Sequence, residues 1–318
     1  MEYTHIRTHR KTHKGFSPLF FIVITMTSVG LWKIIHTPQP IISPIVEQIE
    51  PTKQVKQSKP FIALFSKKKS PQELLDKIDA AVADNVKNYS VLVDDLTTPF
   101  TAGSSENEIY IAASVNKAPI LAALYYYAQK ADIDLDEVIT LQSADKQDYG
   151  TGSLRYESPG STYSIKTLAK LMIKQSDNTA AYILSNHIIG LDKLQEAVNL
   201  WGLTQTDMTA NKTSNKDMAA LFRMIYEHKV TDKAHTDEML SFFKDTDFET
   251  RLPALLPQGV TVYHKIGSEI RNIHDVGIVT FGKVAYYIGV FTNEVTDEAE
   301  AEKTIATVSK VVYEYMNR

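Results

Sequence analysis

A serine and a lysine stand three residues apart in the segment "IYIAASVNKAPILAALYYYAQK" (109–130), where a strand-like run meets a helix-like run. Residues i and i+3 share a helix face, so Ser114 and Lys117 are expected to lie side by side. A serine hydroxyl needs a neighbouring base to become a good nucleophile, and a lysine is such a base only when neutral. Desolvation and the helix N-terminus both lower a lysine pKa. Taken alone, the pair fits an N-cap serine followed by a solvated lysine better than a catalytic pair.

Two further motifs follow in the chain and change this interpretation. Ser176-Asp177-Asn178 stands in "IKQSDNTAAY", and Lys265-Ile266-Gly267-Ser268 stands on a predicted strand. The order S-x-x-K, S-D-N, K-x-G is the signature of penicillin-recognising serine enzymes. The chain from about residue 71 to 318 resembles the class A beta-lactamases and their relatives among the D-alanyl-D-alanine peptidases. The segments "ASVNKAPI", "YGTGSLRYESPGSTYSIKTLAKLMIKQSDNTAA", "DMAALFRMIY" and "HDVGIV" also resemble family segments, in family order.

The resemblance implies a set of catalytic roles. Ser114 would attack a carbonyl carbon and become acylated, and Lys117 would take its proton. Ser176 would pass a proton to the leaving nitrogen. Lys265 would supply a positive field that keeps Lys117 neutral. No metal ion or cofactor is expected, and the implied partner is a beta-lactam or a peptidoglycan stem peptide.

The resemblance also assigns residues to substrate binding. Asn178 would hydrogen-bond the amide of the substrate side chain or Lys117. The backbone N–H groups of Ser114 and Ser268 would form an oxyanion hole, in which each donor is often worth about 3 kcal/mol. Gly267 and Arg271 complete the residues expected at the substrate.

One departure from the family pattern concerns the substrate carboxylate. The family has threonine or serine where this chain has Ile266, and an isoleucine side chain donates no hydrogen bond. Ser268 or Arg271 is expected to compensate, because an arginine can bind a carboxylate through two parallel hydrogen bonds. The alternative for Arg271 is an ordinary solvated loop residue.

A second departure concerns release of the acyl group. Class A enzymes carry a water-activating glutamate between S-D-N and the helix of "DMAALF", but the interval "WGLTQTDMTANKTSNKDMA" (201–219) contains none. Its two acids are Asp207 and Asp217, and Asp217 is typical of a first-turn helix acid. A missing general base typically costs 10²–10⁴-fold in rate. The sequence therefore predicts acylation at Ser114 followed by slow deacylation.

Composition excludes several other classes of protein. The chain has 318 residues, a net charge of -4, no cysteine, and 43% hydrophobic and 23% charged residues. Without a basic patch, nucleic acid is not expected as a partner. Without cysteine, neither a disulfide framework nor a thiol nucleophile is possible.

The N-terminal residues predict membrane attachment. Residues 1–15 form a basic tail ahead of an apolar run at 16–36 that is just long enough to cross a bilayer. Positive charge before the run places the tail in the cytoplasm and the remainder outside. A cleaved signal peptide is the alternative. Residues 37–70 are rich in proline and lysine, and we predict that they form a linker to a domain at 71–318.

The predicted fold is α/β in the α+β sense. Strand-like segments lie near both ends of the domain, in "YSVLVDDL", "TVYHKIGSE", "DVGIVTF" and "VAYYIGVFTN". Helical segments include "SPQELLDKIDAAVADNV", "SIKTLAKLMIKQS", "DNTAAYILSNHIIG" and "DEAEAEKTIATVSKVVYEYMN". We therefore expect a beta-lactamase-like antiparallel sheet built from both chain ends and flanked by helices, with an all-helical subdomain between.

Two functions fit this sequence. The first is a membrane-anchored serine hydrolase outside the cytoplasm, acylated at Ser114 by beta-lactams or D-alanyl peptides. The second is a catalytically silent module on the same fold that binds wall peptides or a protein. Ile266 and the absent glutamate favour the second, whereas Ser114, Lys117 and Ser176 favour the first.

Overall fold

The computed structural model describes residues 69–82, 86 and 88–318. The predicted tail at 1–15, the predicted anchor at 16–36 and all but the last two residues of the predicted linker at 37–70 lie outside this range. Within the described residues, no helix combines the length and apolar composition that a bilayer-spanning segment requires.

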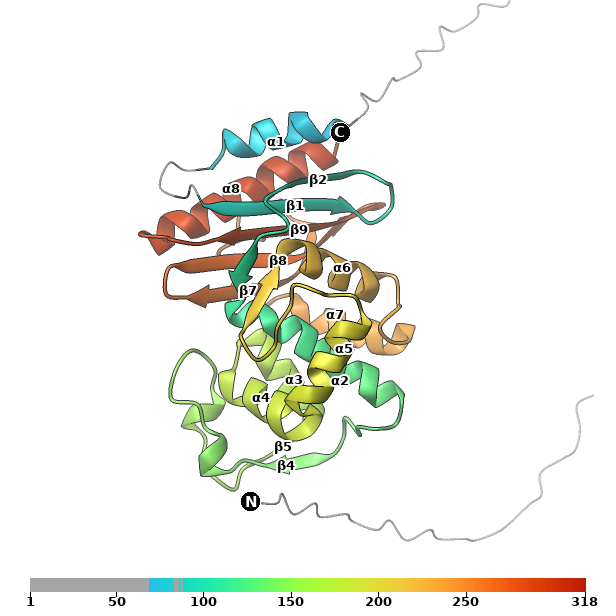
Figure 1. Cartoon of the computed structure of the whole chain (residues 1–318), viewed down its shortest axis with the longest axis vertical. Coiled ribbons are helices and arrows are strands. Elements are labelled where there is room, and N and C mark those ends of the chain that lie inside the picture. Colours follow the sequence, from blue (N-terminus) through green and yellow to red (C-terminus); the bar gives the residue numbers. More distant parts are fainter. Residues whose placement is uncertain (1–68, 83–85, 87) are drawn as a thin grey trace, which may run out of the picture. The chain divides into compact units, whose positions relative to one another are not determined.

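A five-stranded antiparallel sheet forms the centre of the domain, with strand order β2-β1-β9-β8-β7 (Figure 1). Two strands come from the N-terminal side, β1 (Tyr89–Asp95) and β2 (Thr101–Ser104). Three come from the C-terminal side, β7 (Thr261–Glu269), β8 (Asn272–Phe281) and β9 (Val284–Thr292). The pairing of β1 with β9 joins the two ends of the domain, which confirms the predicted sheet.

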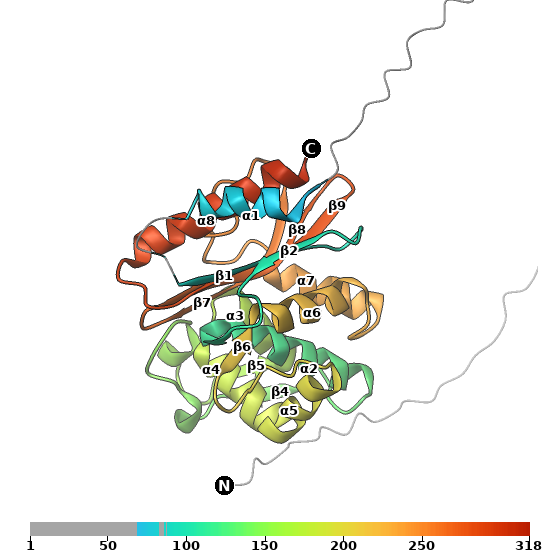
Figure 2. The ribbon, with the colours of Figure 1, turned by 45° about the horizontal axis from the view of Figure 1, so that its top comes forward.

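Two helices cover one face of this sheet (Figures 1 and 2). They are α1 (Pro71–Asp79), which begins after the capping side chain of Ser70, and α8 (Glu298–Met316), capped by Asp297. Their apolar faces form one buried cluster with the sheet, which includes Leu74, Ile288 and Ile305. The hydroxyl of Tyr315 donates to the carbonyl oxygen of Ser70 at 2.9 Å and so ties the end of α8 to the start of α1.

The opposite face of the sheet carries α6 and the helical part of the chain (Figure 2). Its helices are η1 (Ala113–Asn116), α2 (Lys117–Gln129), η2 (Ser143–Asp145), η3 (Leu154–Tyr156), α3 (Ile165–Lys174), α4 (Asn178–Tyr182), η4 (Ile183–Ile189), α5 (Leu191–Leu200), α6 (Asn215–Tyr226) and α7 (Lys233–Phe243). Two small antiparallel pairs join them, β3 (Ile109–Ile111) with β6 (Lys212–Ser214) and β4 (Val138–Thr140) with β5 (Thr162–Ser164). This is the predicted helical subdomain.

Several boundaries differ from the sequence-based expectation. The first helix ends at Asp79, earlier than its apolar spacing suggested. The helix predicted over 177–190 divides into α4 and the wider π-helix η4. Strand β2 was not expected, because it is short and only Ala102 of its residues is buried. Tertiary pairing with β1, rather than local propensity, forms this strand.

The buried side chain of Asn215 links α6 to the middle of the sheet. Its Nδ2 donates to the carbonyl oxygen of Gly289 at 2.9 Å and to Oγ of Ser90 at 3.0 Å. Its Oδ1 accepts from the hydroxyl of Tyr287 at 2.8 Å. A Cβ on Gly289 would lie 2.1 Å from Asn215 Oδ1, so only glycine fits there. Asn215, whose side-chain nitrogen and oxygen both have hydrogen-bond partners, thus joins the helical part to β1 and β9.

We expect Asn215→Ala to lower the free energy of unfolding by about 3 kcal/mol, because it leaves buried partners without hydrogen bonds. Chemical denaturation of the variant measures this loss. The control is Lys216→Ala at the next, exposed position, which should change stability by less than about 0.5 kcal/mol. Equal effects of the two substitutions would contradict the proposed link.

Candidate active site

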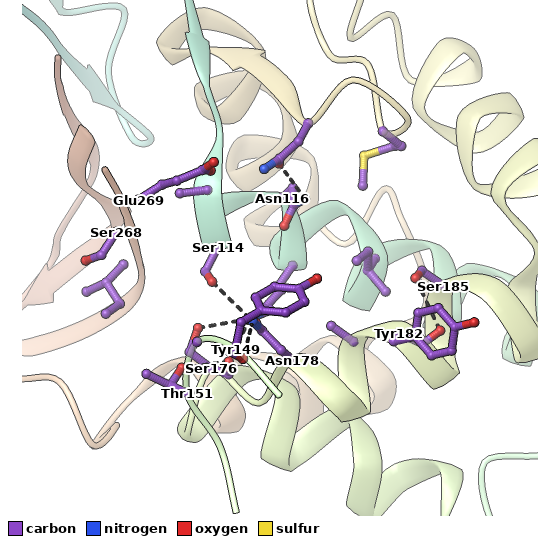
Figure 3. A pocket seen from close by; sticks show the side chains of 18 of the residues that line it. Ser114, Asn116, Tyr149, Thr151, Ser176, Asn178, Tyr182, Ser185, Ser268 and Glu269 are labelled. Carbon is purple, nitrogen blue, oxygen red and sulfur yellow. Dashed lines mark hydrogen bonds between the residues drawn. The ribbon is translucent and has the colours of Figure 1, made fainter. Parts of the chain in front are cut away.

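Ser114 lies at a sharp change of backbone direction between β3 and α2. Ala113, just before it, has a φ of 48°, a left-handed conformation that is uncommon for a residue with a side chain. Ser114 then lies in the 3₁₀ turn η1, in which residues i and i+3 eclipse one another. This geometry sets Lys117 Nζ 2.9 Å from Ser114 Oγ, so the expected pairing of the two side chains is present (Figure 3).

The amine of Lys117 has oxygen neighbours on three sides. Nζ lies 2.6 Å from the carbonyl oxygen of Ser176, 2.7 Å from Oδ1 of Asn178 and 3.1 Å from Oγ of Ser176. The carbonyl and amide oxygens can only accept hydrogen bonds. A neutral amine has two N–H groups, which these two oxygens occupy. Its lone pair is then free to accept the proton of the Ser114 hydroxyl.

Burial favours this neutral form of Lys117. The residue is 3% exposed, and desolvation lowers its pKa from 10.5 to about 7 against the opposing attraction of Asp177. At pH values above about 7, most molecules therefore carry an uncharged amine beside Ser114. The lysine meets the electrostatic requirement for a general base.

The segment Ser176–Asn178 is held in an uncommon conformation. Ser176 has a φ of 52°, and the buried Asp177 accepts from the backbone N–H groups of Ala180 and Leu154, both at 2.9 Å. A Cβ on Gly152 would lie 2.2 Å from the Asp177 carboxylate, so glycine is needed there. Asp177 is therefore a structural residue that fixes its two neighbours.

Lys265 reaches the same group of residues from β7. Its Nζ lies 3.0 Å from Oγ of Ser176, which therefore contacts both lysines. A Cβ on Gly267 would lie 2.9 Å from the carbonyl oxygen of Ala112. Glycine at this position lets β7 approach the turn that carries Ser114.

The positive field expected from Lys265 depends on the pKa of its amine. Burial, and next the nearby Lys117, hold its pKa well below the usual range. Desolvation thus opposes a permanent positive charge on Lys265. An anionic group arriving with the substrate would favour that charge.

Behind Lys265 lies a buried ion pair. His264 Nδ1 lies 2.9 Å from both carboxylate oxygens of Asp275, and its Nε2 lies 3.3 Å from Glu249. Burial alone would lower the His264 pKa, but the two carboxylates outweigh burial and raise it to about 9. The imidazolium compensates the Asp275 charge beside the active lysines.

His274 fixes the strand that leads to Ser114. Its Nδ1 accepts from the backbone N–H of Thr292 at 3.1 Å, so the proton is on Nε2, which lies 2.9 Å from the carbonyl oxygen of Ile111. Burial lowers the pKa of His274 to about 4, which keeps the ring neutral. The neutral ring thus connects β8 and β9 to the end of β3.

A cavity of about 700 Å³ opens over these groups. Ser114, Lys117, Ser176, Asn178 and Ser268 line it, together with Ile266 and the exposed Tyr149 at its rim (Figure 3). The structure therefore gathers five of the eight predicted site residues around one opening.

The other three predicted residues do not line the cavity. Lys265 lies behind Ser176, and Gly267 packs against the turn before Ser114. Arg271 is exposed and donates to the carbonyl oxygen of Glu294 at 3.2 Å. Arg271 thus lies outside the cavity lining, as the alternative of a solvated loop residue has it, and its contact with a substrate carboxylate stays a prediction.

A different arginine, Arg251, stands beside Ser268. Its side chain is 3% exposed, and all five of its N–H groups donate hydrogen bonds. Two go to Glu302, and the other three go to the carbonyl oxygens of Gly267 and His274 and to Oγ of Ser268. Sequence reasoning missed Arg251 and Glu302. No motif marks either residue, because only the tertiary fold brings the loop before β7 and helix α8 to the same place.

Neither acid of the interval 201–219 lines the cavity. Asp207 accepts from the backbone N–H groups of Thr209 and Ala210 and forms a turn. Asp217 is buried and accepts from Gln205 and Thr206. Met208 and Thr209 line the cavity instead, and neither can act as a base.

The family model described as the beta-lactamase enzyme family matches residues 73–316. The chain belongs to this family. The match confirms the family resemblance that the three short motifs indicated, and it extends over nearly the whole described domain. By family and fold, the chain is a serine hydrolase. The comparison with curated proteins gave no significant match.

Solved structures support the same beta-lactamase fold. A beta-lactamase from Sphaerobacter thermophilus is 21% identical, with a TM-score of 0.73 over 78% of this chain and 98% of its own. A class A beta-lactamase from Bacteroides cellulosilyticus is 25% identical, with a TM-score of 0.71 over 78% and 99%. PBP-A is 26% identical, with a TM-score of 0.71 over 77% and 96%. A PBP-A leucine-to-glutamate variant, solved as its penicillin G acyl-enzyme, is also 26% identical, with a TM-score of 0.72 over 77% and 97%.

We expect the Lys117 amine to titrate with a midpoint near pH 7, because burial disfavours the ammonium form. Carbon-13 labelling of lysine Cε and NMR across pH 5 to 11 measures the midpoint, and a Lys117→Met variant identifies the signal. A midpoint above pH 9 would show that the amine stays charged beside Ser114.

Proposed function

We propose that this beta-lactamase family member is an acyl-transfer enzyme that forms a long-lived ester at Ser114 with beta-lactams or D-alanyl wall peptides. The observation that carries the proposal is the arrangement of oxygen atoms around Lys117 Nζ, which leaves its lone pair facing Ser114. Two obligate acceptors take its N–H groups, and burial lowers its pKa to about 7. This arrangement is what a general base for Ser114 requires.

The acylation step follows from these contacts. Lys117 Nζ takes the hydroxyl proton while Ser114 Oγ bonds to the substrate carbonyl carbon. The C–N bond of the substrate then breaks, and the carbonyl carbon remains as an ester on Ser114. The leaving nitrogen needs a proton. The hydroxyl of Ser176 supplies it and is replenished from Lys117, which lies 3.1 Å away.

The substrate carboxylate is proposed to bind at Ser268. Arg251 Nη2 donates to Ser268 Oγ, so the serine hydroxyl keeps its own proton for donation into the cavity. Glu302 holds Arg251 in place. Ser268 thus supplies the hydrogen bond that Ile266 cannot.

Deacylation is proposed to be slow. The loop residues that face the cavity, Met208 and Thr209, carry no basic group, and Asp207 and Asp217 are engaged elsewhere. The penicillin G acyl-enzyme solved for a PBP-A variant supports a stable ester on this fold. PBP-A is thus the more informative relative for this chain.

The protein is proposed to act outside the cytoplasm, as a single-pass protein of the cell membrane. The support is the order of features in the sequence: a basic tail at 1–15, an apolar run at 16–36 and a linker at 37–70. The same tether would keep the active site near the peptidoglycan stem peptides.

A catalytically silent binding module remains the second candidate. Ile266 in the cavity lining favours it, and so do the uncharged loop residues there, Met208 and Thr209. A Ser114→Ala variant that retains the full cellular phenotype would decide for this candidate.

We expect a covalent penicillin adduct on the full chain that persists for many minutes. Intact-mass spectrometry after mixing with benzylpenicillin measures the adduct, and peptide mapping places it on Ser114. Ser114→Ala should abolish it, whereas the exposed, distant Ser143→Ala should not. Rapid complete hydrolysis without a lasting adduct would refute slow release.

We expect Thr209→Glu to speed loss of the adduct by about tenfold or more, as part of the 10²–10⁴-fold that a positioned base can contribute. Thr209 is exposed and lines the cavity. The control is Ala210→Glu, which adds the same charge at the next residue, outside the cavity lining. An equal acceleration in both variants would show that charge alone, rather than a base at the ester, is responsible.

A further inference from the structure

The loop 244–260, which connects α7 to β7 without a helix or strand of its own, forms part of the cavity wall. Two of its residues, Phe248 and Arg251, line the cavity. Arg251 donates to Oγ of Ser268, which Figure 3 shows beside Ser114. A loop without regular backbone hydrogen bonds keeps one conformation only where other contacts fix it. The positions of both wall residues therefore depend on what anchors the loop.

The loop is anchored to the sheet on both sides of Arg251. Before Arg251, Glu249 Oε1 lies 3.3 Å from Nε2 of His264 on β7. After Arg251, the backbone N–H of Leu252 donates to Oδ2 of Asp275 on β8 at 3.1 Å. The residues that face the sheet thus alternate with the residues that line the cavity.

A single buried ring, that of His264, joins the two anchors. Its Nδ1 lies 2.9 Å from both carboxylate oxygens of Asp275, and its Nε2 lies 3.3 Å from both Glu249 Oε1 and Thr246 Oγ1. Ionised carboxylates only accept hydrogen bonds, so pairing with both requires an N–H on each ring nitrogen, which only the imidazolium has. Burial lowers the pKa of His264, but the two carboxylates raise it to about 9, so the imidazolium prevails at neutral pH.

The members of this network differ in exposure. His264 and Asp275 are both 0% exposed, and a buried charge that loses its partner is strongly destabilising. The side chain of Glu249 is 43% exposed. Removing Glu249 therefore leaves the inner ion pair in place and releases only the side of the loop that precedes Arg251.

We propose that His264 is a positioning residue for binding of the substrate carboxylate. By pairing with Asp275 and Glu249 at once, it fixes the loop 244–260 on the sheet. The fixed loop keeps Arg251 at the serine hydroxyl that donates to the carboxylate. This inference rests on the proposed binding of the substrate carboxylate and adds to it the residue that organises the binding site.

The first experiment removes the accessible member of the network from the full chain. Glu249→Ala leaves His264 Nε2 without its carboxylate, whereas the control, Asp247→Ala, removes another exposed acid of the same loop. Adduct formation is followed by intact mass across benzylpenicillin concentrations. We expect Glu249→Ala to raise the half-saturating concentration by about fivefold or more, the factor typical of one net hydrogen bond. Asp247→Ala should leave that concentration within about twofold.

Benzylpenicillin methyl ester separates positioning from a general structural role, because it differs from the acid only in lacking the carboxylate. A general loosening of the fold would weaken acid and ester alike, whereas a loss of positioning weakens only the acid. Glu249→Gln, whose amide oxygen can accept from Nε2, should restore most of the affinity for the acid. Equal effects of Glu249→Ala on acid and ester, or no rescue by Glu249→Gln, would overturn the proposal.

A binding measurement separates this inference from the proposed function. In a Ser114→Ala background no ester can form, and binding of the acid and of its methyl ester is followed as a rise in melting temperature. Suppose that the native chain forms no adduct, yet the acid binds this variant more tightly than the ester and Glu249→Ala removes the difference. The acyl-transfer function then fails and the positioning role stands. If acid and ester bind equally, the positioning role fails, whatever the adduct shows.

Discussion

The active site depends on keeping one lysine amine out of water. Lys117 is 3% exposed, and its Nζ has four oxygen contacts, of which two are obligate acceptors. Desolvation lowers the pKa of the amine to about 7, and the acceptors orient the lone pair of the neutral form toward Ser114. A solvated lysine at the same position would be charged and could not accept the serine proton. The surrounding structure excludes water from this amine and holds its hydrogen-bond partners in place.

Three backbone arrangements hold those partners. Ala113 and Ser176 both have positive φ angles, which cost energy and persist only where neighbouring contacts enforce them. Asp177 enforces the second through its hydrogen bonds to the N–H groups of Ala180 and Leu154. Gly267 allows β7 to pack against the first. At the active site, the sheet and the helical part therefore meet at strained residues.

The grouping of the proposed catalytic residues could be predicted because their spacing is local or their motif order is specific. Ser114 and Lys117 lie within one turn, and the order of the later motifs indicated that Ser176 and Lys265 join them. Arg251 could not be predicted, because its four partner residues come from β7, β8 and α8 and form no sequence pattern. The sheet followed from alternating apolar runs at both chain ends. The π-helix did not, because an extra residue per turn leaves no distinct hydrophobic period.

The proposed slow release of the ester follows from where the acids between α5 and α6 are engaged. Hydrolysis of the ester needs both a water molecule and a base at the carbonyl carbon. Asp207 accepts from the backbone N–H groups of Thr209 and Ala210, and Asp217 accepts from Gln205 and Thr206, so neither carboxylate reaches the cavity. Met208 and Thr209, which do line it, carry no base. Lys117 therefore has no counterpart for the second half of the reaction, and the ester at Ser114 should form faster than it is released.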